Sequence, residues 1–230
     1  MQNSKNKKTV LYLTYDGLLD PLGESQILPY LLGSLKRTDQ LTIISFEKRH
    51  NFKLAQNNLY KKLDSLDITW IPLVFSQRYG SLGKIWDLIK LFVVCTKHSL
   101  YHKPMIVHAR GHITVLIGCC IKLFIGSKLL FDFRGLWVDE RVDKGSWDLS
   151  LFFHRVQYAI FKYLEKYSLK FADHIVVLTN IIVQEIIKIS GQSSNKITVI
   201  PCCADYDHFH LISSEDRRSS YERCKIDSLS

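Results

Sequence analysis

The feature of this sequence that most restricts its fold is a regular alternation of short apolar runs with longer helical patterns. The apolar runs predict strands at residues 9–15, 41–46, 68–73, 105–108, 128–133, 174–178 and 197–201. The helical patterns cover residues 25–37, 51–66, 83–102, 113–125, 151–171 and 180–190. Most of the strands are continuously apolar, which is typical of parallel strands covered by helices on both faces. The sequence therefore predicts an α/β fold built on a doubly wound, Rossmann-like parallel sheet.

Length and composition predict one large domain. Of the 230 residues, 47% are hydrophobic, which is enough to bury a sizeable core. We expect a basic extension at residues 1–8, the Rossmann-like domain at 9–205 and a polar linker at 206–230. The longest apolar run, residues 113–125, is interrupted by Lys122 and is shorter than the roughly 20 residues that span a bilayer.

Charge and cysteine content narrow the classes of partner and compartment. The net charge of +9 favours an anionic partner, although no nucleic-acid-binding motif accompanies it. The six cysteines include two adjacent pairs and no Cys-x-x-Cys, so we expect neither a metal site nor a disulfide framework. This usage favours a reducing cytoplasm. The Gly-x-Gly-x-x-Gly and P-loop motifs are missing, which argues against a Rossmann oxidoreductase and an NTPase.

Polar residues follow the first and fourth predicted strands. They are Asp16, Gly23, Glu24, Ser25 and Gln26 after the first, and Arg110 and His112 after the fourth. Ligands of open α/β sheets bind outside the carboxyl ends of the strands, so both segments are candidate parts of a site. Gly23 would let the backbone approach a ligand, and a helix starting near Ser25 would present its N–H groups to it. The alternative is a plain turn capped by Ser25, with a capping histidine and a surface arginine.

The segment after the fifth predicted strand, KLLFDFRGLWVDER, is the strongest candidate for a site. Its polar members are Asp132, Arg134, Asp139, Glu140 and Arg141. This many charges at the exit of an apolar strand do not stabilise a core, so we expect a loop that borders a ligand and pairs internally. The alternative is a solvated loop with structural Asp–Arg pairs.

The predicted helix at residues 83–102 is basic and amphipathic. Such a helix can lie on an anionic membrane, and the lysines expected to contact it are Lys84, Lys90 and Lys97, with Lys5, Lys7 and Lys8. The alternative, which we favour, is a helix packed on the sheet with its lysines in water.

Five segments together resemble the N-terminal domain of glycosyltransferase family 4, a group of retaining enzymes with the GT-B fold. They are DGLLDPLGESQILPYL, VHARGH, KLLFDFRGLWVDER, FADHIVVLT and ITVIPCCADYDHF, which lie in this order between residues 9 and 209. The resemblance implies an acceptor-binding domain, while a second domain holds the nucleotide-sugar donor. We expect that second domain to be absent, since the family's pair of spaced glutamates is missing.

The resemblance also assigns roles to the residues already singled out. Catalytic roles fall to Arg110, His112 and Glu140. Contacts to substrate fall to Asp16, Gly23, Glu24, Ser25, Gln26, Asp132, Arg134, Asp139 and Arg141. The implied partners are a sugar or lipid-linked acceptor, a nucleotide sugar and a separate donor domain, with no metal or cofactor. The alternative function is a non-catalytic module that docks an acceptor or a membrane, as part of a split transferase or as a decayed remnant.

Overall fold

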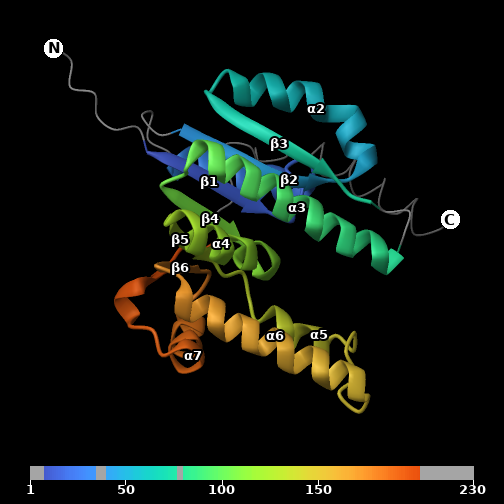
Figure 1. Ribbon diagram of the computed structural model, residues 1–230, viewed down its shortest axis with the longest axis vertical. Helices are drawn as coiled ribbons and strands as arrows, with labels where there is room; N and C mark the ends of the chain where they lie inside the picture. Colours follow the sequence, from blue (N-terminus) through green and yellow to red (C-terminus); the bar gives the residue numbers. More distant parts are fainter. Residues whose placement is uncertain (1–7, 35–39, 77–79, 203–230) are drawn as a thin grey trace, which may run out of the picture.

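The computed structural model describes residues 8–34, 40–76 and 80–202, which form a seven-stranded parallel sheet with helices on both faces (Figure 1). The strands are β1 (Thr9–Thr14), β2 (Gln40–Glu47), β3 (Ile68–Val74), β4 (Ile106–Arg110), β5 (Lys128–Asp132), β6 (His174–Val177) and β7 (Ile197–Val199). Their order across the sheet is β3-β2-β1-β4-β5-β6-β7. This arrangement confirms the predicted Rossmann-like fold.

Helices connect successive strands. They are the π-helical turn η1 (Gly23–Ile27), α1 (Leu28–Ser34), α2 (Arg49–Asp64), α3 (Gly80–His102), α4 (His112–Ile125), α5 (Trp137–Asp143), α6 (Phe152–Phe171), α7 (Asn180–Ser190) and the 3-10 turn η3 (Ser194–Lys196). Each helix predicted from the sequence is found; α7 has the predicted bounds, and the others differ by a few residues at one or both ends.

Helix α5 was not predicted, because its seven residues were expected to form a loop. The segment is short and carries four charges, so it lacks the repeated apolar positions that identify a helix. Contacts with other parts of the domain stabilise α5. Val138 is fully buried, and the Trp137 ring contacts Phe161 of α6 at 5.5 Å between centroids.

Two apolar layers sandwich the sheet. Along β1, Leu11 and Leu13 point into one layer and Tyr12 into the other, as the alternation of strand side chains requires. Helices α3, α4, α6 and α7 contribute to the layer with Leu11, whereas α1 and α2 contribute to the layer with Tyr12. The helices therefore change faces where β1 meets β4.

This change of face fixes where a ligand can bind. In an open sheet of this order, the connections leave β1 and β4 in opposite directions and open a crevice at the carboxyl ends of these strands. Register places Thr14, Arg110 and Asp132 side by side at the ends of β1, β4 and β5. The sheet thus aligns three of the segments that carry polar residues.

One boundary of the predicted domain, at residues 205 and 206, lies outside the described residues. The N-terminal extension is described only at Lys8, and the start of the linker falls beyond Cys202. Within the described part of the chain, no helix combines the length and the apolar character needed to cross a bilayer.

Candidate ligand site at the carboxyl ends of β1, β4 and β5

A cavity of about 260 Å³ opens at the carboxyl ends of these strands. Five of its lining residues were singled out from the sequence, namely Asp16, Arg110, His112, Arg134 and Glu140. Tyr15 and Trp137 add aromatic surface, and sequence reasoning did not assign them to the site. The cavity therefore collects residues from three separate segments of the chain.

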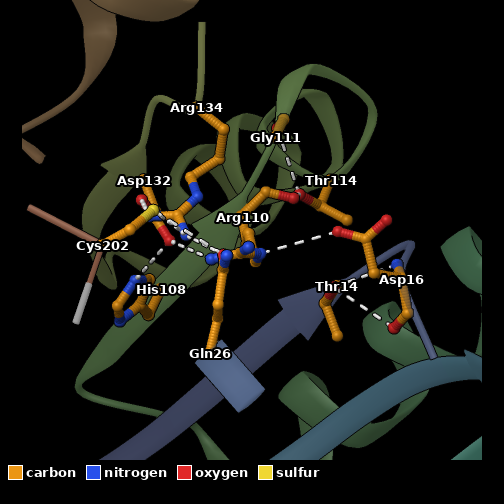
Figure 2. A network of polar contacts seen from close by, with 10 residues as sticks. All are labelled: Thr14, Asp16, Gln26, His108, Arg110, Gly111, Thr114, Asp132, Arg134 and Cys202. Carbon is orange, nitrogen blue, oxygen red and sulfur yellow. Dashed lines mark hydrogen bonds and ion pairs between the residues drawn. The ribbon is translucent and has the colours of Figure 1, made fainter. Parts of the chain in front are cut away.

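Arg110 forms the floor of the cavity. It ends β4, and its side chain is only 5% exposed. Its Nη1 donates to Oδ2 of Asp132 at 3.3 Å, and its Nε lies 3.5 Å from Oδ2 of Asp16 (Figure 2). The Nε–H has no hydrogen-bond partner among the described residues, although it is buried. A buried donor in this state can be satisfied by a bound ligand or by water.

Asp16 is presented by a turn that Thr14 stabilises. The backbone N–H of Asp16 donates to Oγ1 of Thr14 at 3.0 Å. This bond directs the chain after β1 so that the half-exposed carboxylate of Asp16 faces Arg110. A fixed donor and a fixed acceptor consequently lie next to each other.

Asp132 is the buried anion that holds two arginines. Besides Arg110, it accepts from Nη1 of Arg134 at 3.4 Å, and Nε2 of His108 lies 3.8 Å from it. Burial alone would raise the pKa of this carboxyl, but His108, Arg134 and Arg110 outweigh burial and hold the pKa below its usual value. Asp132 is therefore ionised and keeps both guanidinium groups in place.

Arg134 connects this cluster to distant parts of the chain. Its Nη2 donates to Oε1 of Gln26 at 3.3 Å, and the Cys202 thiol lies 3.7 Å from the same oxygen (Figure 2). Cys202 was not assigned to the site from the sequence, although it lies in ITVIPCCADYDHF, one of the five segments that carry the family resemblance. The parallel sheet brings the exits of β5 and β7, which lie on either side of β6, to the same edge.

His112 is the first residue of α4 and also lines the cavity. Its Nε2 lies 2.9 Å from Oε2 of Glu165, whose side chain is fully buried. The ring centroid lies 5.1 Å from that of Phe133 and 5.8 Å from that of Trp137. Glu165 is a second residue that the sequence did not indicate.

The helical form of α5 separates Asp139, Glu140 and Arg141, which were expected to face the cleft together. Successive residues of a helix point about 100° apart, so three in a row cannot share one cavity. Glu140 lines the cavity, whereas Asp139 accepts hydrogen bonds from α6 and the Arg141 guanidinium lies over the Trp137 ring at 4.8 Å. Asp139 and Arg141 therefore do not line the cavity, and a ligand role for them stays a prediction.

Three residues after β1 also lie outside the cavity lining. A Cβ on Gly23 would collide with the backbone of Gly17 and Leu18, so the close approach at this glycine is to the chain itself. The Ser25 hydroxyl donates to the carbonyl of Pro21 at 2.6 Å and does not cap a helix start. Helical geometry begins at Pro21, and Glu24 is exposed. A ligand role for these three stays a prediction.

The chemistry of the lining favours a polyhydroxyl ligand. Guanidinium donors lie beside carboxylate acceptors and the imidazole of His112, and a sugar hydroxyl can both donate and accept a hydrogen bond. Within the described residues, no cluster of His, Cys, Asp and Glu has the arrangement needed to hold a metal ion.

A family model for Glycosyltransferase Family 4 matches residues 31–208. The chain belongs to glycosyltransferase family 4. Among curated protein sequences, none matches this family 4 chain.

Solved structures show the same fold in glycosyltransferases of the GT-B type. Sucrose-phosphate synthase from Thermosynechococcus elongatus has a TM-score of 0.59 at 11% identity, over 93% of this chain and 53% of that one. Anabaena Alr3699/HepE in complex with UDP and glucose has a TM-score of 0.53 at 12% identity, over 87% and 46%. A glycosyltransferase from Rickettsia africae has a TM-score of 0.51 at 17% identity, over 96% and 50%. This family 4 chain thus spans about half the length of these structures, and the predicted N-terminal GT-B domain is confirmed.

Proposed function

We propose that this domain binds the acceptor in a nucleotide-sugar-dependent, retaining glycosyltransferase of glycan, polysaccharide or glycolipid synthesis. The observation that carries the proposal is the cavity at the carboxyl ends of β1, β4 and β5, where fixed donors and acceptors alternate. Such an arrangement recognises the hydroxyl groups of a sugar by their positions, because the buried network around Asp132 prevents the arginines from turning away.

In this proposal each group in the cavity has a distinct task. Glu140 accepts a hydrogen bond from the attacking hydroxyl of the acceptor and orients it. Arg110 and Arg134 donate to neighbouring sugar oxygens, and Trp137 provides an apolar wall for the ring. A retaining transfer passes through a loose, cation-like sugar, and its departing diphosphate needs fixed positive groups. The amino terminus of α4 and Arg110 supply part of this field in advance of the reaction.

The donor in this proposal is a nucleotide sugar that acts as co-substrate, without a metal or another cofactor. Alr3699/HepE structures contain UDP with glucose, or UDP-glucose, on the same fold. We propose that a second domain supplies the contacts to the donor. The lone chain should then release no nucleotide from UDP-glucose. Turnover that disappears in Arg110→Ala would contradict this half-enzyme arrangement.

Binding of acceptor sugars can be tested on the chain directly by saturation-transfer NMR. The probes are the methyl glycosides of glucose, galactose, mannose and N-acetylglucosamine. We expect at least one to bind, and Glu140→Gln to weaken it about tenfold through loss of a charge-assisted hydrogen bond. The matched control is Glu185→Gln on α7, far from the cavity lining. Absence of binding by any probe, or equal binding by both variants, would contradict the proposal.

The exposed face of α3 supports a second proposal, that the domain lies on the cytoplasmic face of an anionic membrane. Large exposed apolar residues cover this helix: Ile85, Trp86, Leu88, Ile89, Phe92, Val93, Leu100 and Tyr101. Lys84 and Lys97 are exposed beside them, whereas the acidic residue of the helix, Asp87, is buried. Apolar side chains flanked by lysines suit an interface with acidic lipids.

One lysine of the membrane prediction has another task in the structure. Lys90 donates to the carbonyl of Val74 at 3.0 Å and pairs with Asp87 at 3.4 Å, which fastens α3 to the end of β3. Asp87 in turn accepts the backbone N–H of Ser76. The proposed membrane contact therefore depends on Lys84 and Lys97, while Lys5 and Lys7 lie outside the described residues.

A further inference from the structure

His112 reaches the cavity from α4 while its other side contacts a buried carboxylate. Nε2 of His112 lies 2.9 Å from Oε2 of Glu165, and the two side chains are 10% and 0% exposed. Glu165 belongs to α6 and stands 53 residues from His112 in the sequence. A fully buried carboxylate needs hydrogen-bond partners on both oxygens. The partner of the second oxygen of Glu165 therefore decides whether this carboxylate can stay charged.

The second oxygen of Glu165 is held by a lysine. Oε1 accepts from Nζ of Lys162 at 2.7 Å, and the same ammonium donates to Oδ2 of Asp139 at 2.8 Å. Asp139 also accepts from the hydroxyl of Tyr158 at 2.8 Å. Burial alone would raise the pKa of Asp139, but Lys162 and Tyr158 hold it below its usual value. The chain of contacts from α5 through α6 to α4 thus ends at His112.

This chain of contacts assigns the protons. Lys162 has only donors and an ionised Glu165 has only acceptors, so the hydrogen bond to His112 requires a proton on Nε2. The ring is also confined by Phe133 and Trp137, at 5.1 and 5.8 Å between centroids. Nδ1 is then the ring nitrogen left for a ligand in the cavity.

We propose that Glu165 is a positioning residue that holds His112 as the Nε2–H tautomer, so that Nδ1 accepts a hydrogen bond from a hydroxyl of the bound sugar. The identity of the ligand rests on the proposed function, whereas the tautomer does not. The role of Asp139 follows as well. Asp139 holds the ammonium group of Lys162 in place, and so acts on the cavity through the side chains of Lys162 and Glu165.

The tautomer can be read in the full chain by NMR of protein labelled with ¹⁵N-histidine. Long-range ¹H–¹⁵N spectra distinguish a protonated from an unprotonated ring nitrogen, and the signal lost in His112→Gln identifies His112. We expect a proton on Nε2 in spectra recorded at about pH 8. A wild-type His112 that carries its proton on Nδ1 alone would overturn the proposal, whatever any variant does.

Glu165→Gln gives the sharper result. The glutamine oxygen must face the donors of Lys162, so its NH₂ group faces Nε2 and turns that nitrogen into an acceptor. The variant should therefore move the proton of His112 from Nε2 to Nδ1. The matched control, Glu185→Gln, should leave the spectrum unchanged. An unchanged His112 signal in folded Glu165→Gln would overturn the proposal.

Sugar binding separates this proposal from the function on which it rests. If a methyl glycoside binds the wild type, Glu165→Gln should weaken it about tenfold, since Nδ1–H can no longer accept from the hydroxyl. Unchanged binding despite an inverted tautomer would overturn the role of Nδ1. If no glycoside binds the wild type, the proposed function fails, and the His112 spectrum still decides the role of Glu165.

Discussion

At the scale of single residues, the cavity depends on groups that cannot be removed without leaving a buried partner unsatisfied. Asp132 shows this best, because its two oxygens hold Arg110 and Arg134 at 3.3 and 3.4 Å. The ion pairs of Asp132 by themselves contribute little to the free energy of unfolding. Loss of the Asp132 charge would leave guanidinium groups buried without their anion, which is costly.

Asp132→Asn should lower the free energy of unfolding by about 3 kcal/mol at neutral pH. The carboxyl pKa is lowered in the fold, so its stabilisation exists above the unfolded value of ~3.9 and is lost as pH falls through the folded value. The wild type should thus lose more stability than Asp132→Asn below about pH 4. Urea unfolding at a series of pH values from neutral to acid measures the loss at neutral pH and the difference in acid, with exposed Asp64→Asn as the control. Parallel acid curves for wild type and Asp132→Asn would contradict the pairing.

Two glycines close in sequence should respond in opposite directions to the same substitution. A Cβ at Gly23 meets the backbone of Gly17 and Leu18, so Gly23→Ala should destabilise by about 2 kcal/mol or more. Gly33, in α1, has nothing within 4 Å of its Cβ position, and Gly33→Ala should stabilise by about 0.5–1 kcal/mol. Thermal unfolding of both variants tests this account of the loop after β1. Similar shifts in Tm with the same sign for the two variants would refute it.

At the scale of elements, the loop after β1 is held by the end of β2. The Glu47 side chain is fully buried and accepts the backbone N–H groups of Leu18 and Leu19 at 2.9 and 3.1 Å, with Ser45 donating to it as well. A Cβ on Gly17 would come within 2.8 Å of this carboxylate. One side chain therefore sets the path of the segment that presents Asp16.

Glu47→Gln should destabilise the domain by about 1–3 kcal/mol, since the amide offers one acceptor to donors that two oxygens now satisfy. Hydrogen exchange at Leu18 and Leu19 should speed up beyond the global change, because these amides lose their partner. Exposed Glu185→Gln should shift stability by no more than about 0.5 kcal/mol. Unaltered exchange at both leucines would show that the loop is held by other contacts.

At the scale of the whole molecule, the large exposed apolar face of α3 needs an explanation that a helix packed on a sheet does not provide. Patches of this kind on soluble domains mark contacts with other surfaces. The lysines beside the patch favour an acidic lipid surface over a neutral one. The same face would also favour self-association in water, which lipid vesicles should suppress.

Replacing Lys84 and Lys97 together by glutamine should lower partition onto vesicles that contain phosphatidylglycerol by about 10- to 30-fold, at about 1 kcal/mol per lysine. Lys61→Gln with Lys62→Gln on α2 removes the same charge elsewhere and should change little. Vesicle flotation at low and moderate salt measures the partition of both double variants. Equal recovery of the wild type with phosphatidylcholine and phosphatidylglycerol vesicles would reject the electrostatic part.

Local sequence patterns were enough to predict the class of fold, the order of its elements and the strand exits that carry polar residues. These follow from local patterns, since continuous apolar runs, helical periodicity and charges next to a strand are all visible within about ten residues. The resemblance to glycosyltransferase family 4 rested on such segments, and the family match confirms it. Arg110, His112, Arg134 and Glu140 were therefore found in advance.

Which polar residues face one another depends on how the whole domain packs. Cys202 lies at the cluster because parallel crossovers bring strand exits together, and Glu165 contacts His112 because α6 packs against α4. Neither contact is visible in a local sequence pattern. Asp139 does not line the cavity because α5 is a helix. Packing against α6 stabilises this helix, although its sequence is too highly charged to predict one. Contacts between side chains depend on orientation as well as proximity, and orientation is set by the packing of the whole domain.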